Sequence, residues 1–394
     1  MKTVSIISEY NPFHLGHEYM IQKVREILGE VTVVAVMSTS FVQRGEPALF
    51  PCEVRAKAAL LCGADLVISL PFPYSASGAR YFSRAGVWIA NAFEGEKYLA
   101  FGSECGEIAE ILSVSERINA DSFKAMVDNR PQNEPQALAT ERIYKEIYGD
   151  DGADILASPN NVLALEYLAA IKEFESDVIP ITLKREGGGY NSADVSVVRP
   201  SATALRQAIA VGDAESFFCG VPAAAADIYN EAIQNGEYSL GWGKLSSALL
   251  SKFRLSDMGE FDGVAEFTAG LAPRLVSAAE RAADADEFFS LAATKHYTNA
   301  RIRRAVLSAL LKVREADVSA LPSAVRVLAS NSKGFEVLGR VKADVMKIIT
   351  KPSDYSADDR HSLLVRRAEA LYDLSLEKSK GALDFMRRTP YIEK

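Results

Sequence analysis

The chain has 394 residues, enough for two or three domains of ordinary size with their own hydrophobic cores. Hydrophobic residues make up 48% and charged residues 24%, which is usual for a globular protein and excludes a disordered, collagen-like or disulfide-rich chain. Every uncharged apolar run is shorter than the roughly 18 residues that a membrane-spanning helix needs, so we expect no membrane contact.

The cysteines and the first residues indicate the cellular compartment. Cys52, Cys62, Cys105 and Cys219 are spaced too irregularly for a zinc site or a disulfide framework. Residues 1–10 contain one lysine, a short apolar stretch and no small-residue cleavage site, which is typical of a first strand rather than of a signal peptide. We therefore expect a cytoplasmic protein.

Charge is distributed unevenly along the chain. Residues 291–394 contain 20 Lys and Arg against 12 Asp and Glu, a net charge of +8. Residues 1–290 therefore carry −16, because the whole chain carries −8. Such asymmetry suggests a polyanionic partner such as nucleic acid, but the charge count taken alone favours the simpler explanation of solvated helix faces.

The first half of the chain alternates between strand and helix patterns. The predicted strands are Val- and Ile-rich runs without strict alternation, as in parallel strands covered on both faces: residues 4–8, 31–38, 65–70, 97–101 and 178–184. The predicted helices have apolar periodicity: residues 18–28, 53–61, 159–174 and 202–211. This order predicts a doubly wound, Rossmann-like α/β domain over residues 1–211, with a loop at 186–201.

Helical patterns dominate after Gly212. The predicted helices cover residues 222–234, 245–253, 264–287, 299–313 and 358–378. Pro273 is expected to break or kink the third of these, and the segment Asn331-Ser-Lys333-Gly is predicted to be a turn. Residues 212–394 are therefore predicted to form a second, mostly α-helical domain with a basic character.

The strongest chemical signal is the segment 8–17 (SEYNPFHLGH), between the first strand and the first helix. Ligands bind at the carboxyl ends of strands in such sheets, and helix N-termini attract anions. Gly16 permits close approach to a phosphate, while His14 and His17 are one helical turn apart and can stabilise charge on departing pyrophosphate. The alternative is a structural pair in which His14 caps a turn and His17 packs on the helix. The position of the segment favours phosphate binding.

Several motifs carry a family resemblance. Asn11-Pro-Phe-His-Leu-Gly-His17 resembles the H-x-G-H signature of the nucleotidyltransferase superfamily, which shares ancestry with class I aminoacyl-tRNA synthetases. Further segments resemble blocks of one family: 37–48 (MSTSFVQRGEPA), 63–71 (GADLVISLP), 101–104 (FGSE), 158–161 (SPNN), 201–206 (SATALR) and 294–304 (TKHYTNARIRR). On these motifs the chain is identified as a member of the bacterial tRNA(Met) cytidine acetate ligase family.

The resemblance implies a reaction. Family members use ATP and acetate to acetylate N4 of the wobble cytidine of elongator tRNA(Met), through acetyl-adenylate, giving N4-acetylcytidine, AMP and pyrophosphate. Acetyl-CoA is not the donor. Mg²⁺ is expected to accompany ATP, and no metal-ligating residue is predicted. The sequence indicates no oligomeric state.

The resemblance also implies the site residues. The expected catalytic residues are His14, His17 and Arg206. The expected ATP-binding residues are Ile7, Ser8, Glu9, Tyr10, Asn11, Pro12, Phe13, His14, Leu15, Gly16, His17, Glu18, Tyr19, Met20, Gly102, one or both of Asn160 and Asn161, Arg185, Ser201 and Thr203. Most of these residues end a predicted strand or begin a predicted helix, where phosphates bind, although helix capping or a surface ion pair is the simpler explanation for several.

The expected RNA-binding residues are Arg44, Lys295, Arg301 and Arg304. Arg44 follows the second predicted strand, and Arg301 and Arg304 share a helix face at i, i+3 spacing. A solvated helix face is the alternative for the basic residues near the C-terminus.

Some positions depart from the family pattern, and two other functions remain open. The departures are Thr39 and Ser40 (usually Gly-Asn), Ser69 (usually acidic) and Asn191 (often His). A small-molecule nucleotidyltransferase is one alternative, but such an enzyme needs little beyond the α/β domain. A non-catalytic nucleotide- or tRNA-binding protein is the other, and the two intact phosphate motifs argue against it.

Overall fold

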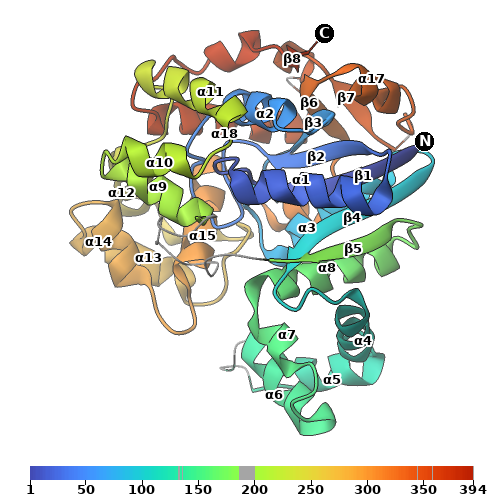
Figure 1. Cartoon of the computed structure of the whole chain (residues 1–394). Helices are drawn as coiled ribbons and strands as arrows, with labels where there is room; N and C mark the ends of the chain where they lie inside the picture. The colour runs from blue at the N-terminus through green and yellow to red at the C-terminus, as the bar shows by residue number, and fades with distance from the viewer. Residues whose placement is uncertain (132–133, 135, 186–199, 344, 357, 394) are drawn as a thin grey trace.

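A mixed sheet forms the centre of the molecule. The computed structural model describes residues 1–131, 134, 136–185, 200–343, 345–356 and 358–393. In this part of the chain the strand order is β5-β4-β1-β2-β3-β6-β7, with β8 pairing to β6 (Figure 1). The strands are β1 (Lys2–Ser8), β2 (Thr32–Ser38), β3 (Leu66–Leu70), β4 (Glu96–Ser103), β5 (Ile179–Lys184), β6 (Ala324–Ser330), β7 (Lys347–Ile349) and β8 (Tyr391–Ile392).

The first five strands are parallel, which confirms the predicted α/β fold. The chain runs from β1 through β2 to β3 on one side, and β4 and β5 then pair on the other side of β1. The order therefore reverses between β1 and β4. In open α/β sheets this reversal opens a crevice at the carboxyl ends of the strands, where ligands bind.

Helices cover both faces of the sheet, which explains the lack of alternation in its strands. In β2, Val33, Ala35 and Met37 face a core shared with α1 (Leu15–Leu28), α2 (Cys52–Leu61) and α11 (Ala223–Gln234). Val34 and Val36 face the opposite core, shared with α3 (Ala79–Asn91). Because all five side chains are fully buried, no polar residue interrupts the strand.

A small helical lobe hangs from the β4–β5 side of the sheet (Figure 1). It comprises α4 (Ile108–Ile118), α5 (Asp121–Asp128), α6 (Gln136–Tyr148) and α7 (Ala153–Ala157), followed by α8 (Pro159–Glu173). Its core includes Phe123, Ile143 and Tyr144 and continues to Leu99 and Phe101 of β4. The lobe thus extends the core at the end of the sheet where β4 finishes.

The remaining described helices follow β5. They are α9 (Ala202–Ala210), α10 (Ala214–Cys219), α12 (Ser246–Leu255), α13 (Leu271–Arg281), α14 (Ala285–Ala292), α15 (Asn299–Leu311), α16 (Glu315–Ser319), α17 (Ser332–Leu338) and α18 (Arg360–Ser375). Short 3-10 turns lie at Tyr74–Ala76, Gly241–Leu245, Met258–Phe261, Pro352–Asp354 and Asp384–Arg387. Phe41 and Phe72, from the first half of the chain, share a core with several of these helices.

The prediction of a helical segment over residues 264–287, broken or kinked at Pro273, is wrong. The helix α13 begins only at Leu271, so Pro273 lies in its first turn, where a proline costs no hydrogen bond. A new helix, α14, begins after Asp284, whose side chain accepts a hydrogen bond from the Glu287 amide.

Residues after 212 also contribute strands, which the sequence analysis did not expect. All seven residues of β6 are buried, and this strand pairs antiparallel with β3. The predicted turn at 331–334 is instead the start of α17, capped by Asn331. Gly334 lies directly against the sheet, because a Cβ there would be 2.3 Å from the Asp65 carbonyl oxygen. The sheet therefore contains strands from both predicted domains. The domain boundary at residues 211/212 stays a prediction.

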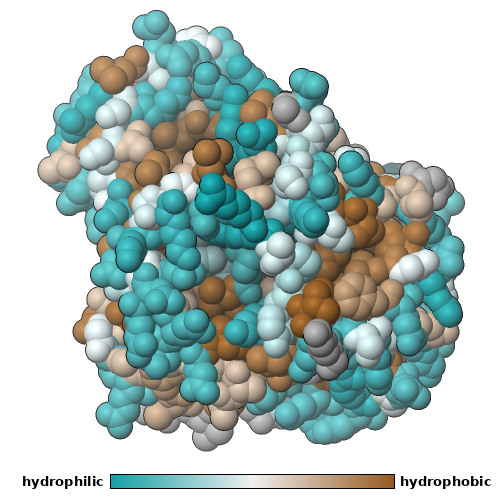
Figure 2. Space-filling model, turned by 90° about the horizontal axis from the view of Figure 1, so that it is seen from above, coloured by the Kyte–Doolittle hydropathy of each residue, from teal (hydrophilic) through white to brown (hydrophobic). Residues whose placement is uncertain are grey.

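Hydrophilic and hydrophobic residues are intermixed on the described surface. Seen from above, hydrophilic residues cover much of the molecule and hydrophobic residues gather in several places between them (Figure 2). The most exposed large hydrophobic residues, Leu255 and Val211, belong to different segments. Within the described residues, no helix combines the length and the apolar character needed to cross a membrane.

Candidate active site

A cavity lies where the strand order reverses. Many of the residues predicted from the motifs line it: Ile7, Ser8, Glu9, Tyr10, Asn11, His14, His17, Met20, Arg44, Gly102, Asn160, Arg185, Ser201, Thr203 and Arg206. They come from segments spread over about 200 residues, yet they meet because β1, β4 and β5 end on the same side of the sheet.

Other predicted ATP-site residues do not line the cavity: Pro12, Phe13, Leu15, Gly16, Glu18, Tyr19 and Asn161. Phe13 is fully buried, and its amide donates to the Tyr229 hydroxyl at 2.9 Å. The Asn161 side chain accepts a hydrogen bond from the Glu104 amide at 2.9 Å. These two residues do not reach the cavity, but their hydrogen bonds hold the segments that line it.

Several lining residues were not predicted from the sequence: Ile6, Gln43, Phe82, Phe101, Leu163, Tyr167 and Ala202. Gln43 and Phe101 stand within motifs that mark the family, so their place next to Arg44 and Gly102 was a usable signal. Phe82, Leu163 and Tyr167 lie on α3 and α8, where nothing in the sequence distinguishes them from ordinary core residues.

The two histidines begin α1 and bind each other's backbone. His14 is the N-cap, and its Nδ1 accepts from the Gly16 amide at 3.0 Å. The Nδ1 atom of His17 accepts from the His14 amide at 3.2 Å, and the two rings lie 3.8 Å apart. Because both Nδ1 atoms are acceptors, a neutral ring carries its proton on Nε2. Each Nε2–H is then a donor suited to a phosphate oxygen.

Both histidines are neutral near pH 7. Burial lowers the pKa of His14 to about 3, with further lowering by the positive charges of Arg185 and Arg206. Burial also lowers the pKa of His17 well below its ordinary value, helped by His14 and Arg185. The positive charge in the cavity therefore comes from arginine, and the histidines contribute neutral donors.

A second helix N-terminus enters the cavity at α9. The Ser201 side chain caps it by accepting from the Ala204 amide at 3.1 Å. Arg206 is held by two acceptors, because it donates to the Asn11 carbonyl oxygen at 2.8 Å and to the Thr203 hydroxyl at 3.2 Å. Two helix N-termini and a fixed guanidinium thus converge on one space, as an anion-binding site requires.

Another part of the cavity wall is made by β4, α8 and Arg185. A Cβ on Gly102 would lie 3.0 Å from the Arg185 Cγ, so the glycine lets this arginine cross the end of β4. The Glu104 carboxylate accepts from the Asn160 side chain at 2.7 Å and from the Asn161 amide at 2.9 Å. This carboxylate therefore caps α8 and fixes Asn160 at the cavity.

The loop 41–47 connects the cavity to α15. On one side, the Gln43 amide donates to the Glu9 carboxylate at 3.0 Å. On the other side, the Glu46 carboxylate forms a 2.7 Å ion pair with Arg303 of α15. Gly45 has a φ of +72°, and a Cβ there would lie 2.7 Å from the Arg304 amide nitrogen. The loop is therefore packed tightly between the cavity and α15.

The predicted RNA-binding residues do not form one group. Arg44 lines the cavity, whereas Lys295, Arg301 and Arg304 lie outside it. Lys295 is exposed, and the Arg301 guanidinium lies 5.1 Å from the centre of the Tyr297 ring. Arg304 forms a 2.7 Å ion pair with Glu266, and only 15% of its side chain is exposed. Arg304 thus already has an anionic protein partner.

The described departures from the family pattern, Thr39, Ser40 and Ser69, do not line the cavity. The Ser40 hydroxyl donates to the buried Glu369 carboxylate, and the Ser69 hydroxyl accepts from the Arg326 amide at 2.8 Å. The Thr39 carbonyl oxygen accepts from Arg55. Asn191 and most of the predicted loop 186–201 lie outside the described residues.

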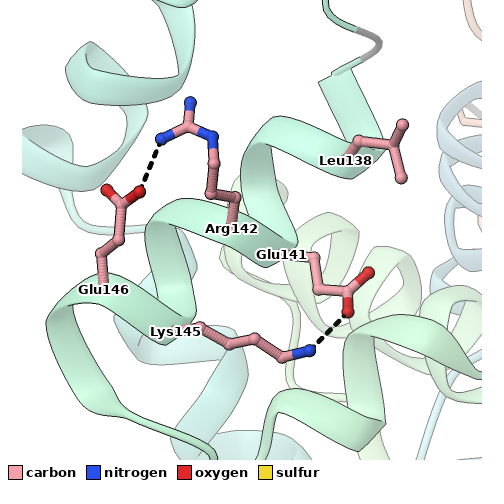
Figure 3. A pocket seen from close by; sticks show the side chains of 5 residues that line it. All are labelled: Leu138, Glu141, Arg142, Lys145 and Glu146. Atoms are coloured by element: carbon pink, nitrogen blue, oxygen red, sulfur yellow. Dashed lines mark hydrogen bonds and ion pairs between the residues drawn. The ribbon is translucent and has the colours of Figure 1, made fainter.

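A second hollow on α6 has no comparable chemistry. It is lined by Leu138, Glu141, Arg142, Lys145 and Glu146 (Figure 3). Arg142 pairs with Glu146 at 2.9 Å and Lys145 with Glu141 at 2.8 Å, both at i, i+4 spacing. Such pairs on an exposed helix face contribute little to stability, because solvent screens them.

Comparison with known proteins agrees with the motifs. A family model described as HIGH Nucleotidyl Transferase matches residues 1–384. The tRNA(Met) cytidine acetate ligase of Acetivibrio thermocellus is 31% identical over 373 residues, which cover 90% of this chain and 89% of the relative. The protein of the same name from Caldicellulosiruptor saccharolyticus is 35% identical over 370 residues, covering 90% of this chain and 88% of the relative.

Two crystal structures share the fold over the full length. Thermotoga maritima TmcAL in its apo form matches with a TM-score of 0.91 and 26% identity, covering 100% of both chains. The same protein bound with alpha-thio ATP matches with a TM-score of 0.88 and 26% identity, covering 100% of this chain and 99% of the other. The agreement of motifs, family model, relatives and fold shows that the chain belongs to the tRNA(Met) cytidine acetate ligase family of HIGH nucleotidyltransferases.

Proposed function

We propose that this protein is an ATP-dependent ligase that acetylates a cytidine of tRNA(Met). The observation that carries the proposal is the convergence of two helix N-termini, two neutral histidines and three arginines on one cavity at the reversal of strand order. That arrangement suits a nucleoside triphosphate, and a relative with this fold has been crystallised with an ATP analogue.

The geometry supports a division of labour among the lining residues. His14, His17 and Arg206 hold the β- and γ-phosphates and stabilise the departing pyrophosphate, while Ser201 and Thr203 present the α9 N-terminus to the same charge. Gly102, Asn160 and Arg185 form the wall that receives the nucleoside. Apart from the Glu9 side chain, the remaining predicted residues of the 7–20 segment shape the pocket or support it.

The reaction has two steps. The acetate carboxylate attacks the α-phosphate of ATP, which gives acetyl-adenylate and pyrophosphate. The N4 amine of the wobble cytidine of elongator tRNA(Met) then attacks the acetyl carbonyl, which gives N4-acetylcytidine and releases AMP. We propose that this takes place in the cytoplasm.

Mg²⁺ is proposed only as a companion of the triphosphate. Among the described residues, no three His, Cys, Asp or Glu side chains are grouped so that they could hold a metal ion. Mg²⁺ commonly binds through phosphates and keeps several waters, so the nucleotide itself would supply most of its ligands. No step above is routed through the metal.

For the RNA, we propose contacts from Arg44 at the cavity and from Lys295, Arg301 and Arg304 beyond the 41–47 loop, within a tRNA-binding C-terminal region. Residues 291–394 carry a net charge of +8, which favours an RNA backbone. Arg304 would have to exchange Glu266 for a phosphate, so we assign most of the binding free energy to the other three residues.

The direct test measures ATP–pyrophosphate exchange with and without acetate, followed by transfer of labelled acetate to elongator tRNA(Met). The proposal expects acetate-dependent exchange and one AMP formed for each acetyl group transferred. Exchange that needs a different acceptor would indicate a small-molecule nucleotidyltransferase. Nucleotide or tRNA binding without any exchange would indicate a non-catalytic protein.

A further inference from the structure

One lining residue does not fit an anion-binding cavity. ATP and acetate are both anions, and the cavity is lined by three positively charged side chains, Arg44, Arg185 and Arg206. Among the described residues that line it, Glu9 is the single carboxylate. A negative charge beside two anionic substrates weakens their binding, so its presence calls for a different substrate group.

The carboxylate of Glu9 is held in a fixed position. Glu9 directly follows β1, and its Oε1 accepts a hydrogen bond from the Gln43 amide at 3.0 Å. The same segment of chain leads within five residues to His14, where we place the phosphates. Glu9 therefore joins the chain segment that carries the two histidines to the 41–47 loop.

That loop also contacts the helix that carries Arg301 and Arg304, two of the proposed RNA contacts. It carries Arg44, and through Glu46 and Gly45 it packs on α15 at Arg303 and Arg304. Gly102 and Asn160 line the cavity from β4 and α8 instead. A cytidine that reaches the cavity past the 41–47 loop would come within reach of the Glu9 carboxylate.

The chemistry of the cytidine matches a carboxylate. The N4 amine of cytosine is a hydrogen-bond donor, and Glu and Asp are the side chains that accept from it. The amine must also lose a proton when it forms an amide. Building on the proposed function, we infer that the Glu9 carboxylate accepts a hydrogen bond from the cytidine N4 amine and takes up its proton during acetyl transfer.

The step balances without any further reactant. A bond forms between N4 and the acetyl carbonyl carbon, and the bond from that carbon to the AMP oxygen breaks. AMP leaves with the electron pair, and one N4 proton passes to Glu9 and later to water. Glu9 is thus a catalytic residue of the second step. Its backbone lines the cavity with the rest of the 7–20 segment, but its carboxylate takes no part in the first step.

The surroundings of Glu9 suit a proton acceptor. Burial raises its pKa above the ordinary value, and the nearby Glu46 raises it further. Arg206 and Arg44 act in the opposite direction, as does the Gln43 hydrogen bond. A carboxyl whose pKa is raised toward neutrality is a better general base near pH 7 than an exposed one.

The test separates the two steps with Glu9→Gln, which keeps an oxygen for the Gln43 amide but accepts no proton. Acetate-dependent ATP–pyrophosphate exchange should stay within about threefold of the unmodified enzyme, while single-turnover acetyl transfer to tRNA should fall about 10²–10⁴-fold. The unmodified enzyme should transfer faster as pH rises through the Glu9 pKa, and the variant should lose this dependence. Glu9→Asp should restore part of the rate and the pH dependence.

A matched control is Glu107→Gln, which removes an exposed carboxylate outside the cavity and should leave both steps unchanged. Unchanged transfer by Glu9→Gln would overturn the inference and favour an AMP phosphate oxygen as the proton acceptor. An equal loss of exchange and transfer would overturn it too, because Glu9 would then serve the nucleotide. Absence of exchange in the unmodified enzyme would instead refute the proposed function.

Discussion

At the residue scale, the two histidines of α1 combine a structural and a chemical use. Their Nδ1 atoms cap the helix, and their Nε2 atoms remain for the substrate. The sequence presented capping and phosphate binding as alternatives, yet one imidazole ring offers both at opposite edges. The H-x-G-H spacing allows this because the helix N-cap and N3 positions lie next to each other.

The two uses of His14 can be separated by substitution. His14→Asn keeps an N-cap side chain and removes the Nε2 donor, so acetate-dependent exchange should fall about 10²–10³-fold with little change in Tm. His14→Ala removes the cap too, and should lose about 0.5–2 kcal/mol of stability in addition. Equal activity of the unmodified enzyme and the Asn variant would mean that His14 is only structural.

Stability should fall in acid because of the same residue. The folded chain holds the His14 pKa at about 3, against an ordinary value of 6.5. Between these values the unfolded chain binds a proton that the folded chain does not, so stability decreases as pH falls through this window. Thermal unfolding from pH 7 to pH 4 should show a steeper loss of Tm for the unmodified enzyme than for His14→Asn. Parallel curves would show that His14 is solvated in the folded state.

At the scale of elements, the 41–47 loop depends on a glycine. Gly45→Ala would force a residue with a side chain to adopt a positive φ and would place its Cβ 2.7 Å from the α15 backbone. Gly29 also has a positive φ, of +71°, but a Cβ there has no neighbour within 4 Å. Gly29→Ala should therefore cost about 1 kcal/mol, and Gly45→Ala about 1–3 kcal/mol more. Chemical denaturation of both variants measures the difference, and equal losses would contradict the tight packing.

The basic face near α15 should contribute to RNA affinity. Lys295→Ala and Arg301→Ala should each weaken tRNA binding and lower the slope of log K against log salt by roughly 0.7–0.9, without changing ATP affinity. Arg142→Ala, on the exposed face of α6, is the control and should bind tRNA normally. Unchanged salt slopes would refute these contacts. Arg304 is a poorer choice, because its removal leaves Glu266 without its partner.

The elements also show what sequence patterns can reveal. The central parallel strands were predictable, because a strand buried on both faces needs an uninterrupted apolar run such as Val33–Met37, whereas the edge strand β5 is only partly buried. Strand β6 was not, because Arg326 interrupts its apolar run and helical patterns surround it. Only the fold explains that arginine, whose charge is buried against Glu53 at 2.7 Å.

At the scale of the whole molecule, the two predicted domains depend on each other. Phe41 and Phe72 pack against helices that follow residue 212, and β3 pairs with β6. Residues 1–211 produced alone should therefore fail to unfold cooperatively and should expose apolar surface to a hydrophobic dye. The intact chain provides the control. A cooperative thermal transition of the isolated piece would instead support an independent domain ending at residue 211.

The site was more predictable than its surroundings. Residues such as His14, Gly102 and Arg206 end strands or begin helices, and the topology of a parallel sheet brings such positions together. The ion pairs that decide which arginines stay available for RNA were not predictable. Arg304 pairs with Glu266, which lies in an irregular segment before α13. Such a segment has no repeating apolar pattern from which its conformation could be predicted.

The pairing of β3 with β6 also matters while the protein is being synthesised. On the ribosome, β3 is complete about 250 residues before β6, the strand that pairs with its outer edge, is made. At about 5–20 residues per second, that interval is roughly 13–50 s. During this time an apolar strand offers unpaired backbone groups to any other nascent chain. Translation speed, rather than the intrinsic folding rate of the sheet, therefore sets how long each new molecule is vulnerable to aggregation.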